Sequence, residues 1–211
     1  MKKVFYLLTL SVLFVVGCST EEVQSIDSSS ENLNQEAARG STNATYGYLS
    51  FSHAMADNGH TMYVKSDNVD PFFAAFPNGV AGGNTLSVHP KSVQGTGTFI
   101  HKDEIGNLMA SGTWEATKLL SFKNYGPAGA DTGFPFADGR AGFANIRVHL
   151  VADAGPGAGA EFDATLHIRC LLPGNDSTPP SWVEGIRITV QDGLNFNKTV
   201  VGGVTIFLDL N

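Results

Sequence analysis

Apolar and polar residues alternate along most of the chain from residue 45 onward, a period typical of strands with one buried face. No segment carries a helical period over the length of an ordinary helix, and the alternation breaks down over 71–90 and 125–142, which we interpret as long irregular loops. The sequence therefore predicts an all-β domain. Its predicted strands are 45–55, 61–66, 95–105, 108–122, 143–151, 161–172, 182–190 and 200–210.

The strongest hairpin signal is Gly106-Asn107, which separates two alternating segments and suits a two-residue turn. A turn at this place aligns Phe99 with Trp114 and His101 with Gly112 across the two strands. A cross-strand aromatic pair of this kind fixes the register of a hairpin. The pattern thus puts Phe99, His101 and Trp114 on one apolar face.

Neighbouring strands with one apolar face bury that face most simply by closing into a barrel or by stacking as two sheets. The segments Gly97-Thr98-Phe99 and Gly112-Thr113-Trp114 resemble the glycine-rich strands of allene oxide cyclase and dirigent-type barrels. The resemblance implies a barrel and carries over no catalytic residue. We predict a single antiparallel β-barrel of about eight strands, with a two-sheet β-sandwich as the alternative.

The N-terminus has a different pattern, in which Met1-Lys2-Lys3 precedes an uncharged apolar run over 4–16 and then Gly17 and Cys18. The run is too short to span a bilayer and is typical of a targeting segment. It resembles the signal peptide and lipobox of bacterial lipoproteins, which implies removal of residues 1–17 and a lipid on the sulfur of Cys18. The alternative is an ordinary secretory signal.

Residues 18–44 are rich in Ser, Glu, Asn and Gln and poor in large apolar side chains, which predicts a disordered tether ahead of one domain over 45–211. The acids at Glu21-Glu22 are similar to the short export signal of some Bacteroidota lipoproteins. Together these features predict a protein anchored by lipid to the bacterial outer membrane. The sequence leaves the periplasmic and the cell-surface side open.

Composition narrows the partners further. With 20 acidic and 13 basic residues the formal net charge is −7, which disfavours binding to nucleic acid. Cys18 and Cys170 are the two cysteines, so lipidation of the first leaves no internal disulfide. The six histidines have no metal-ligand spacing, and we predict neither a metal nor a cofactor.

His101 and Asp103 are the first candidates for chemistry, because two ionisable residues on an apolar face must be paired, solvated in a cavity or functional. His53 also falls on a face that we predict to be apolar. We therefore predict an acid–base pair of His101 and Asp103, and a ligand site of His53, His101 and Trp114. The alternative is that each is a core or rim residue with a partner of its own.

A second candidate is the polar face of the predicted hairpin over 143–172. It carries Arg147, His149, His167 and Arg169, and Arg187 has the same parity on the next strand. Guanidinium groups favour carboxylates, phosphates and sulfated sugars. The alternative is a solvated outer face with cross-strand Asp–Arg pairs.

Three functions agree with these observations. The first is a lipid-anchored envelope protein whose barrel binds a small apolar or anionic ligand. The second is a barrel enzyme of the cyclase or isomerase kind that uses His101 and Asp103. The third is a structural or adhesive envelope protein without a pocket.

Overall fold

The computed structural model describes residues 43–70 and 83–211, so the predicted lipobox at Cys18 and most of the predicted tether lie outside the described residues. Within these described residues, eleven strands form one antiparallel sheet, and the prediction of an all-β fold is confirmed. The expected number of about eight strands is too low, because three short strands lack a run long enough to show alternation. The strands are β1 (Thr45–Met55), β2 (Thr61–Ser66), β3 (Thr85–Ser87), β4 (Ser92–Gln94), β5 (Thr96–Lys102), β6 (Leu108–Gly126), β7 (Gly139–Ala154), β8 (Glu161–Cys170), β9 (Gly185–Val190), β10 (Asn195–Phe196) and β11 (Thr199–Asp209).

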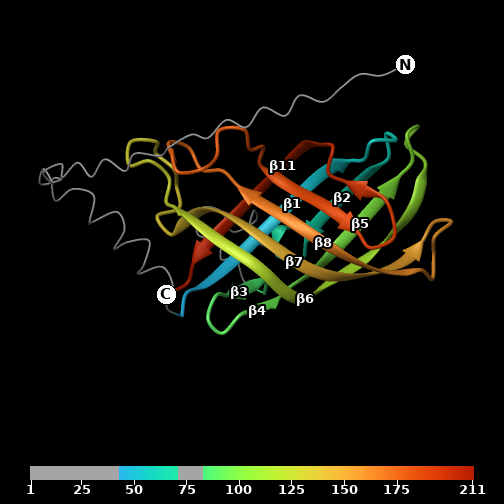
Figure 1. The fold of residues 1–211 in the computed structure, drawn as a ribbon, viewed down its shortest axis with the longest axis horizontal. Coiled ribbons are helices and arrows are strands. Elements are labelled where there is room, and N and C mark those ends of the chain that lie inside the picture. Colours follow the sequence, from blue (N-terminus) through green and yellow to red (C-terminus); the bar gives the residue numbers. More distant parts are fainter. Residues whose placement is uncertain (1–42, 71–82) are drawn as a thin grey trace, which may run out of the picture.

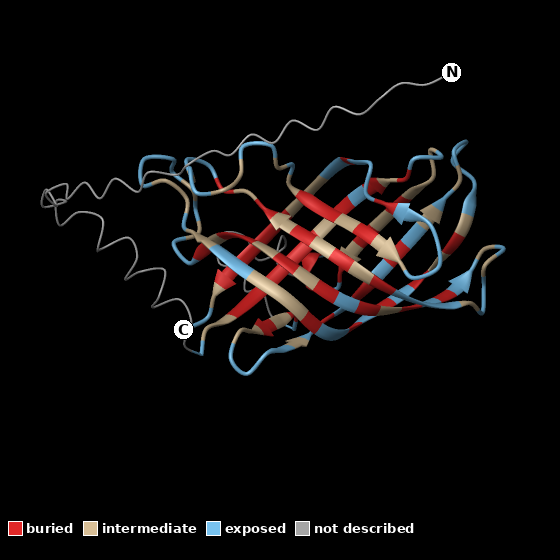
Figure 2. Ribbon diagram, in the orientation of Figure 1, coloured by how far each residue is buried: buried red, intermediate tan, exposed pale blue. Residues whose placement is uncertain are grey.

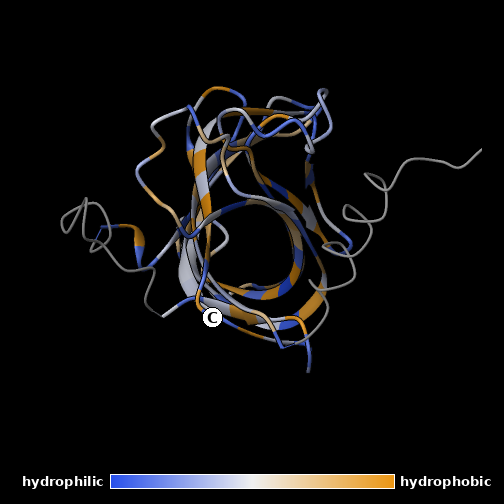
Figure 3. Ribbon diagram, turned by 90° about the vertical axis from the view of Figure 1, so that its left-hand side faces the viewer, coloured by the Kyte–Doolittle hydropathy of each residue, from blue (hydrophilic) through white to orange (hydrophobic). Residues whose placement is uncertain are grey.

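The sheet returns on itself. Its main path runs β10-β9-β8-β7-β6-β5-β2-β1-β3-β4, and β11 lies off this path and pairs with both β1 and β7. The strands β1, β2, β5, β6, β7 and β11 are therefore joined by hydrogen bonds into a ring, and the ribbon winds around a common axis (Figures 1 and 3). The β5–β6 and β7–β8 turns lie at one end of the molecule, on the right in Figure 1.

One large core lies on the inward faces of these strands, and buried and exposed residues alternate along them (Figure 2). Ile146, Val148 and Leu150 of β7 and Leu166 and Ile168 of β8 are almost completely buried, as their alternation predicts. Burial of this continuous apolar face is the main stabilising contribution available to the domain. No helix in the described part of the chain has the length and apolar character needed to cross a membrane.

The β5–β6 hairpin differs from the predicted register by two residues. Phe99 pairs with Gly112 and His101 with Ala110, so the expected pairing of Phe99 with Trp114 is wrong. The cause is that the turn is longer than the predicted two residues and begins at Asp103. The Asp103 amide donates to the Asn107 carbonyl, and the Gly106 amide donates to the Asp103 carbonyl. The inward parity of Phe99 and Trp114 is nevertheless preserved, because a shift of two residues keeps each side chain on its face.

The predicted faces of β1 are inverted. Tyr46, Tyr48, Ser50 and Ser52 are buried against the interior, whereas His53 is exposed. The outward face of β1 also carries apolar residues, and for this reason the alternation predicted the wrong inward face. These residues are part of a second apolar cluster on the outside of the sheet. That cluster contains Leu49, Val69, Ile206 and Leu208, with Phe51, Phe136 and Val204 packed against it.

The inward hydroxyls of Ser50 and Ser52 in β1, and the side chain of Asn68 beside it, have partners within the protein, whereas the buried hydroxyl of Tyr48 has none in the described residues. The hydroxyls of Ser50 and Thr205 are 2.9 Å apart, the Ser52 hydroxyl donates to the Gly202 carbonyl at 3.1 Å, and Asn68 Nδ2 donates to the Tyr48 carbonyl at 3.0 Å. These hydrogen bonds offset the cost of removing the polar groups from water. Small hydroxyl residues are therefore accepted on a face that their polarity alone would assign to solvent.

Candidate functional site

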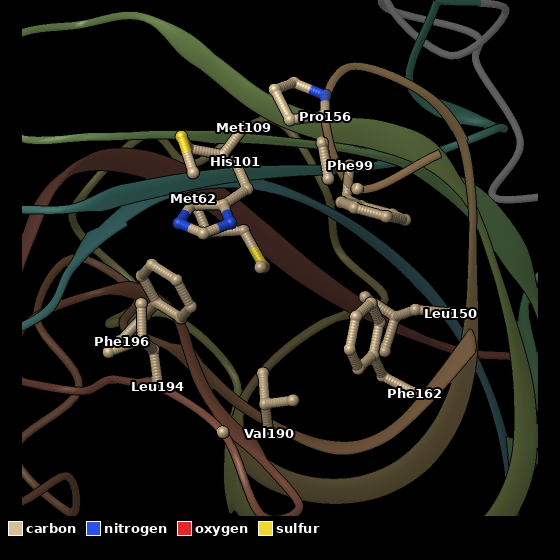
Figure 4. A pocket seen from close by; sticks show the side chains of 13 residues that line it. Met62, Phe99, His101, Met109, Leu150, Pro156, Phe162, Val190, Leu194 and Phe196 are labelled. Atoms are coloured by element: carbon tan, nitrogen blue, oxygen red, sulfur yellow. The ribbon is translucent and has the colours of Figure 1, made fainter. Parts of the chain in front are cut away.

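A cavity of about 370 Å³ opens at the end of the ring where the β5–β6 and β7–β8 turns lie. Its wall is almost entirely apolar, and His101 is the one side chain with a titratable group in it (Figure 4). The volume is within the range of small-molecule sites, and a mainly apolar lining with few polar groups is typical of them. The lining residues are Met62, Phe99, His101, Met109, Ala110, Leu150, Pro156, Gly157, Phe162, Val190, Gly193, Leu194 and Phe196.

The imidazole of His101 is half-buried and fixed by its neighbours. It lies beside Phe196 in Figure 4, and the two rings are packed edge to face with their centroids 5.2 Å apart. Burial, and then the nearby His60, lower the pKa of His101 below its usual value, although Asp103 acts in the opposite direction. His101 is therefore neutral at pH 7.

His101 is the inner end of a hydrogen-bonded chain that reaches solvent. His101 Nε2 lies 3.0 Å from His60 Nδ1, and His60 Nε2 lies 3.2 Å from Glu104 Oε2. The side chain of His60 is 17% exposed and that of Glu104 is 59% exposed, so the chain runs from the cavity outward.

The order of donors along this chain follows from the carboxylate, which only accepts. In the tautomer of His60 that carries its proton on Nε2, facing Glu104, Nδ1 of His60 accepts from Nε2–H of His101. Nδ1 of His101 is then left without a proton, and no side chain or backbone group in the described part of the chain donates to it. The cavity wall thus presents a single imidazole acceptor.

Strand pairing explains why these three residues meet. Thr61 at the start of β2 pairs with Lys102 at the end of β5, so His60 and Glu104 lie just outside the same end of one strand pair. The His60 carbonyl accepts from the Ala56 amide and closes the β1–β2 turn, which fixes the backbone of His60. No sequence motif joins His60 to His101, and only the β2–β5 register could have revealed the pair.

Asp103 does not form the predicted pair with His101. Its Oδ1 accepts from the amides of Ile105 and Asn107 at 3.1 and 2.7 Å, and its Oδ2 accepts from the Asn107 side chain at 2.9 Å. Desolvation opposes any fall in its pKa, but the hydrogen bonds from Asn107, Ile105 and Gly106 outweigh it and lower the pKa of Asp103. Its carboxylate caps the turn and lines no part of the cavity.

His53 and Trp114 also lie outside the cavity. His53 is exposed on the outer face of β1, where its ring stacks on Tyr63 at a centroid distance of 4.5 Å. Trp114 points inward, as its parity predicts, but it is buried in the core and donates Nε1–H to the Lys65 carbonyl at 3.3 Å. The expected meeting of His53, His101 and Trp114 therefore does not occur.

The second predicted site divides into two parts. His149 is held between Asp163 and Glu161, at 3.1 and 3.3 Å, and Asp163 in particular raises the pKa of His149. The solvated outer face that we kept as the alternative expected Asp–Arg pairs, whereas the cross-strand pairs found here join His149 to two carboxylates. Arg147, His167 and Arg169 lie on the same outer face of β7 and β8 without a carboxylate partner in the described residues.

Metal and thiol chemistry find no support in the described part of the chain. Residues 43–70 and 83–211 contain no group of three His, Cys, Asp or Glu side chains placed to hold a metal ion. Cys170 is buried, and burial and then Glu184 raise the pKa of its thiol, which disfavours the nucleophilic thiolate.

Comparison of the chain with protein-family models, with curated proteins and with solved structures finds no match. The function must therefore be argued from the geometry of the chain itself.

Proposed function

We propose that this protein is a lipid-anchored envelope protein whose strands form a closed antiparallel barrel that binds a small, mainly apolar ligand. The ligand occupies the cavity at His101 and donates one hydrogen bond to Nδ1 of that residue. The observation that carries the proposal is an apolar cavity of about 370 Å³ with a single oriented imidazole in its wall.

Strand pairing supports a barrel over a two-sheet sandwich. β11 pairs with β1 along most of its length and with β7 at Phe207 and Leu208, so no free edge remains between β1 and β7. β9 packs against the seam as well, where the Ser52 hydroxyl of β1 lies 3.5 Å from the Ile186 carbonyl. A closed sheet with a cavity at one end is a recurrent arrangement for binding small ligands.

The ligand test uses methionine methyl groups as reporters, since Met62 and Met109 line the cavity and Met55 does not. We would titrate protein labelled with ¹³C at the methionine methyl groups with 1-octanol and with its methyl ether, which lacks the donor. Octanol should shift the signals of Met62 and Met109 and leave that of Met55 unchanged. The ether should bind more weakly, by about threefold to tenfold, because one hydrogen bond is lost.

His101→Phe keeps an aromatic ring and removes the acceptor, and His53→Phe is the matched control on the outer face. The first variant should bring the affinity for octanol down to that for the ether, and the second should change neither. If neither probe shifts Met62 or Met109, the cavity is not a binding site. If His101→Phe weakens both probes equally, the imidazole contributes shape and not a hydrogen bond.

The anchor is tested separately. Cys18→Ser should abolish partitioning into detergent and membranes, because the sulfur that would carry the lipid is lost. A variant that still partitions like the wild type would mean that a lipid on Cys18 is not the anchor.

An acid–base enzyme is the second candidate, and the chain from His101 through His60 to Glu104 favours it. Nδ1 of His101 would take a proton from an acidic C–H or O–H of the substrate, while its Nε2 proton moves to Nδ1 of His60 and the His60 Nε2 proton moves toward Glu104. A binding protein needs no such route to solvent.

Native mass spectrometry of the protein from its own cells would identify a bound molecule. If the wild type exchanges C–H for C–D in that molecule in heavy water and His60→Phe does not, the protein is an enzyme.

The third function, a structural or adhesive protein without a pocket, requires a filled interior. The cavity at His101 argues against it, so we place it last.

A further inference from the structure

We propose that the outer face of β7, β8 and β9 holds a second binding site, for a saccharide unit that carries a carboxylate or sulfate group. This site is independent of the cavity at His101. Its residues come together through strand register: Asn145, His167 and Arg187 form one row across the three strands, and Arg147, Thr165 and Thr189 form the next. Arg169 lies on the same outer face of β8, two residues beyond His167.

The three arginines of this face lack negative partners. Within the described residues, no carboxylate, carbonyl or hydroxyl accepts a hydrogen bond from the side chain of Arg147, Arg169 or Arg187. Nε of Arg169 and Nη1 of Arg187 are buried and unpaired. Unpaired guanidinium groups are unexpected in a chain with a net charge of −7, because acidic residues are abundant and an unpaired, partly buried charge destabilises the fold.

Arg169 and Arg187 are diagonal neighbours on adjacent strands, because Arg169 pairs with Gly185 and His167 pairs with Arg187. Burial, and then the charge of Arg187, lower the pKa of Arg169. The acids nearest in sequence are engaged elsewhere, since Asp163 pairs with His149 and Glu184 accepts from the amide of Thr205. An oxyanion between the two guanidinium groups would remove the repulsion and supply the missing acceptors.

His167 forms hydrogen bonds to side chains on both neighbouring strands and adds no charge to this face. Its Nδ1 lies 2.6 Å from Oδ1 of Asn145, whose own Nδ2 donates to the Ser121 hydroxyl, and its Nε2 lies 3.1 Å from the Thr189 hydroxyl. Burial, followed by Arg169 and Arg187, lowers the pKa of His167. The neutral imidazole therefore donates to Asn145 and accepts from Thr189, and the positive charge of the face comes from the arginines.

Arg169 is oriented by aromatic rings and not by a hydrogen bond to a protein acceptor among the described residues. Its guanidinium carbon lies 4.8 Å from the centroid of Trp182 and 6.0 Å from that of Phe143. Trp182 is itself supported by Tyr125, at a centroid distance of 5.4 Å. Stacking on aromatic rings orients a guanidinium group without consuming its donors, which lowers the entropy lost when an anion binds.

A depression of about 350 Å³ on the same face gives room for the body of the ligand, and Arg147 is the one of the three arginines that lines it. It is lined by Arg147, Asp163, Ala164, Thr165, Thr189 and Gln191, and it is continuous with the row of His167 through Thr189. Hydroxyl, amide and carboxylate groups suit the hydroxyls of a sugar, which both donate and accept. The acidic group would lie at Arg169 and Arg187 and the ring over the depression.

The test is a titration of the full chain with glucuronate, glucose, and inorganic sulfate and phosphate, at low ionic strength, followed by Trp fluorescence and calorimetry. Glucuronate should bind and should weaken as sodium chloride is added, because ion pairs between exposed groups are screened. Glucose should bind at least about tenfold more weakly. Binding of sulfate or phosphate without glucuronate would mean a site for free inorganic anions and would overturn the saccharide.

Arg187→Gln should lower the affinity for glucuronate at least about tenfold, whereas Lys102→Gln, the same charge change on the distant end of β5, should leave it within about twofold. Thermal unfolding serves as a second readout that does not depend on yield: glucuronate should raise the melting temperature of the wild type and not that of Arg187→Gln. His101→Phe should bind glucuronate like the wild type. Equal affinities of the wild type and Arg187→Gln would overturn the site, whatever the outcome at His101.

Discussion

The folded structure favours the neutral, protonated form of the Glu184 side chain. Burial raises its pKa to about 7, although the amide of Thr205, which donates to Oε1 at 2.8 Å, partly opposes the shift. The folded state thus holds a proton that the unfolded state releases at lower pH. Its contribution to stability is complete below about pH 4.5 and is lost as the pH rises to about 7.

We expect Glu184→Gln to stabilise the protein above pH 7 and to leave its stability unchanged at pH 4. The amide oxygen keeps the hydrogen bond from Thr205 and cannot ionise, so the gain at pH 8 should be about 2 kcal/mol, after a reduction for partial exposure. Urea unfolding at the two pH values measures the effect, with the exposed Glu115→Gln as control. A gain that does not depend on pH would show that the carboxyl titrates normally.

Trp114 was predicted to contact a ligand, and the structure places its side chain in the core. We expect Trp114→Ala to destabilise the protein by about 3–5 kcal/mol, because a buried aromatic ring and its hydrogen bond to Lys65 are lost. Trp182→Ala, on the half-buried outer face, should cost less than half as much. A loss below about 1 kcal/mol for Trp114→Ala in urea unfolding would contradict the core placement.

At the level of the element, the contact of β5 with β6 shows what a pattern of alternation can and cannot predict. The alternation correctly predicts which residues of β5 and β6 face inward, since parity survives a shift of two residues. The pairing was wrong because the side chain of Asp103 closes the turn, and such a cap is not visible in the alternation. In β1 the alternation failed because a second apolar cluster covers Leu49 and Phe51 on the outside.

The observed register leaves no room for a side chain at Gly97. Gly97 is opposite Trp114, and a Cβ at this position would meet the Lys65 carbonyl and would lie 2.5 Å from Nε1 of Trp114. We expect Gly97→Ala to destabilise the protein by about 1–3 kcal/mol, because backbone and indole must both shift. Gly202→Ala, which would meet nothing within 4 Å, is the control for unfolding experiments. Equal stability of the two variants would favour the register predicted from Gly106-Asn107.

The candidate site shows the limit of sequence reasoning at the same scale. His101 was singled out by its place on an apolar face, and the structure places it in the cavity wall. His60 and Glu104 were missed because His60 is far from His101 along the chain and meets it through the pairing of Thr61 with Lys102. Asp103 was chosen in place of Glu104 because it shares the parity of His101, although a turn, and not a strand, begins there.

On the scale of the whole molecule, the fold class and the long strands were predictable because an interior shared by many strands imposes the same period on all of them. A barrel was expected from the single apolar face, but the strand pairs that join the ring were not predictable, since they depend on how β11 meets two strands that are distant in the chain. The contact with β7 is short: Phe207 pairs with Arg140, Leu208 pairs with Gly139, and the Asp209 amide donates to the Asp138 carbonyl at 2.9 Å. The stability of the hydrogen-bonded ring must depend on this seam.

Arg140 and Asp209 hold the seam through an ion pair, with Nη2 and Oδ2 3.3 Å apart and with only 21% and 24% of the side chains exposed. We expect a double-mutant cycle of Arg140→Met and Asp209→Asn to give a coupling energy of about 1–2 kcal/mol in urea unfolding, because the pair is partly shielded from water. The matched cycle of Lys65→Met and Asp70→Asn tests a pair in which Asp70 is 75% exposed, and its coupling should stay below about 0.5 kcal/mol. Closure also protects the backbone, so the amide of Asp209 should exchange with solvent far more slowly in the wild type than in Arg140→Met. Coupling energies that are equal in the two cycles, together with rapid exchange at Asp209 in the wild type, would mean that β7 and β11 are not joined and that the sheet is open along this edge.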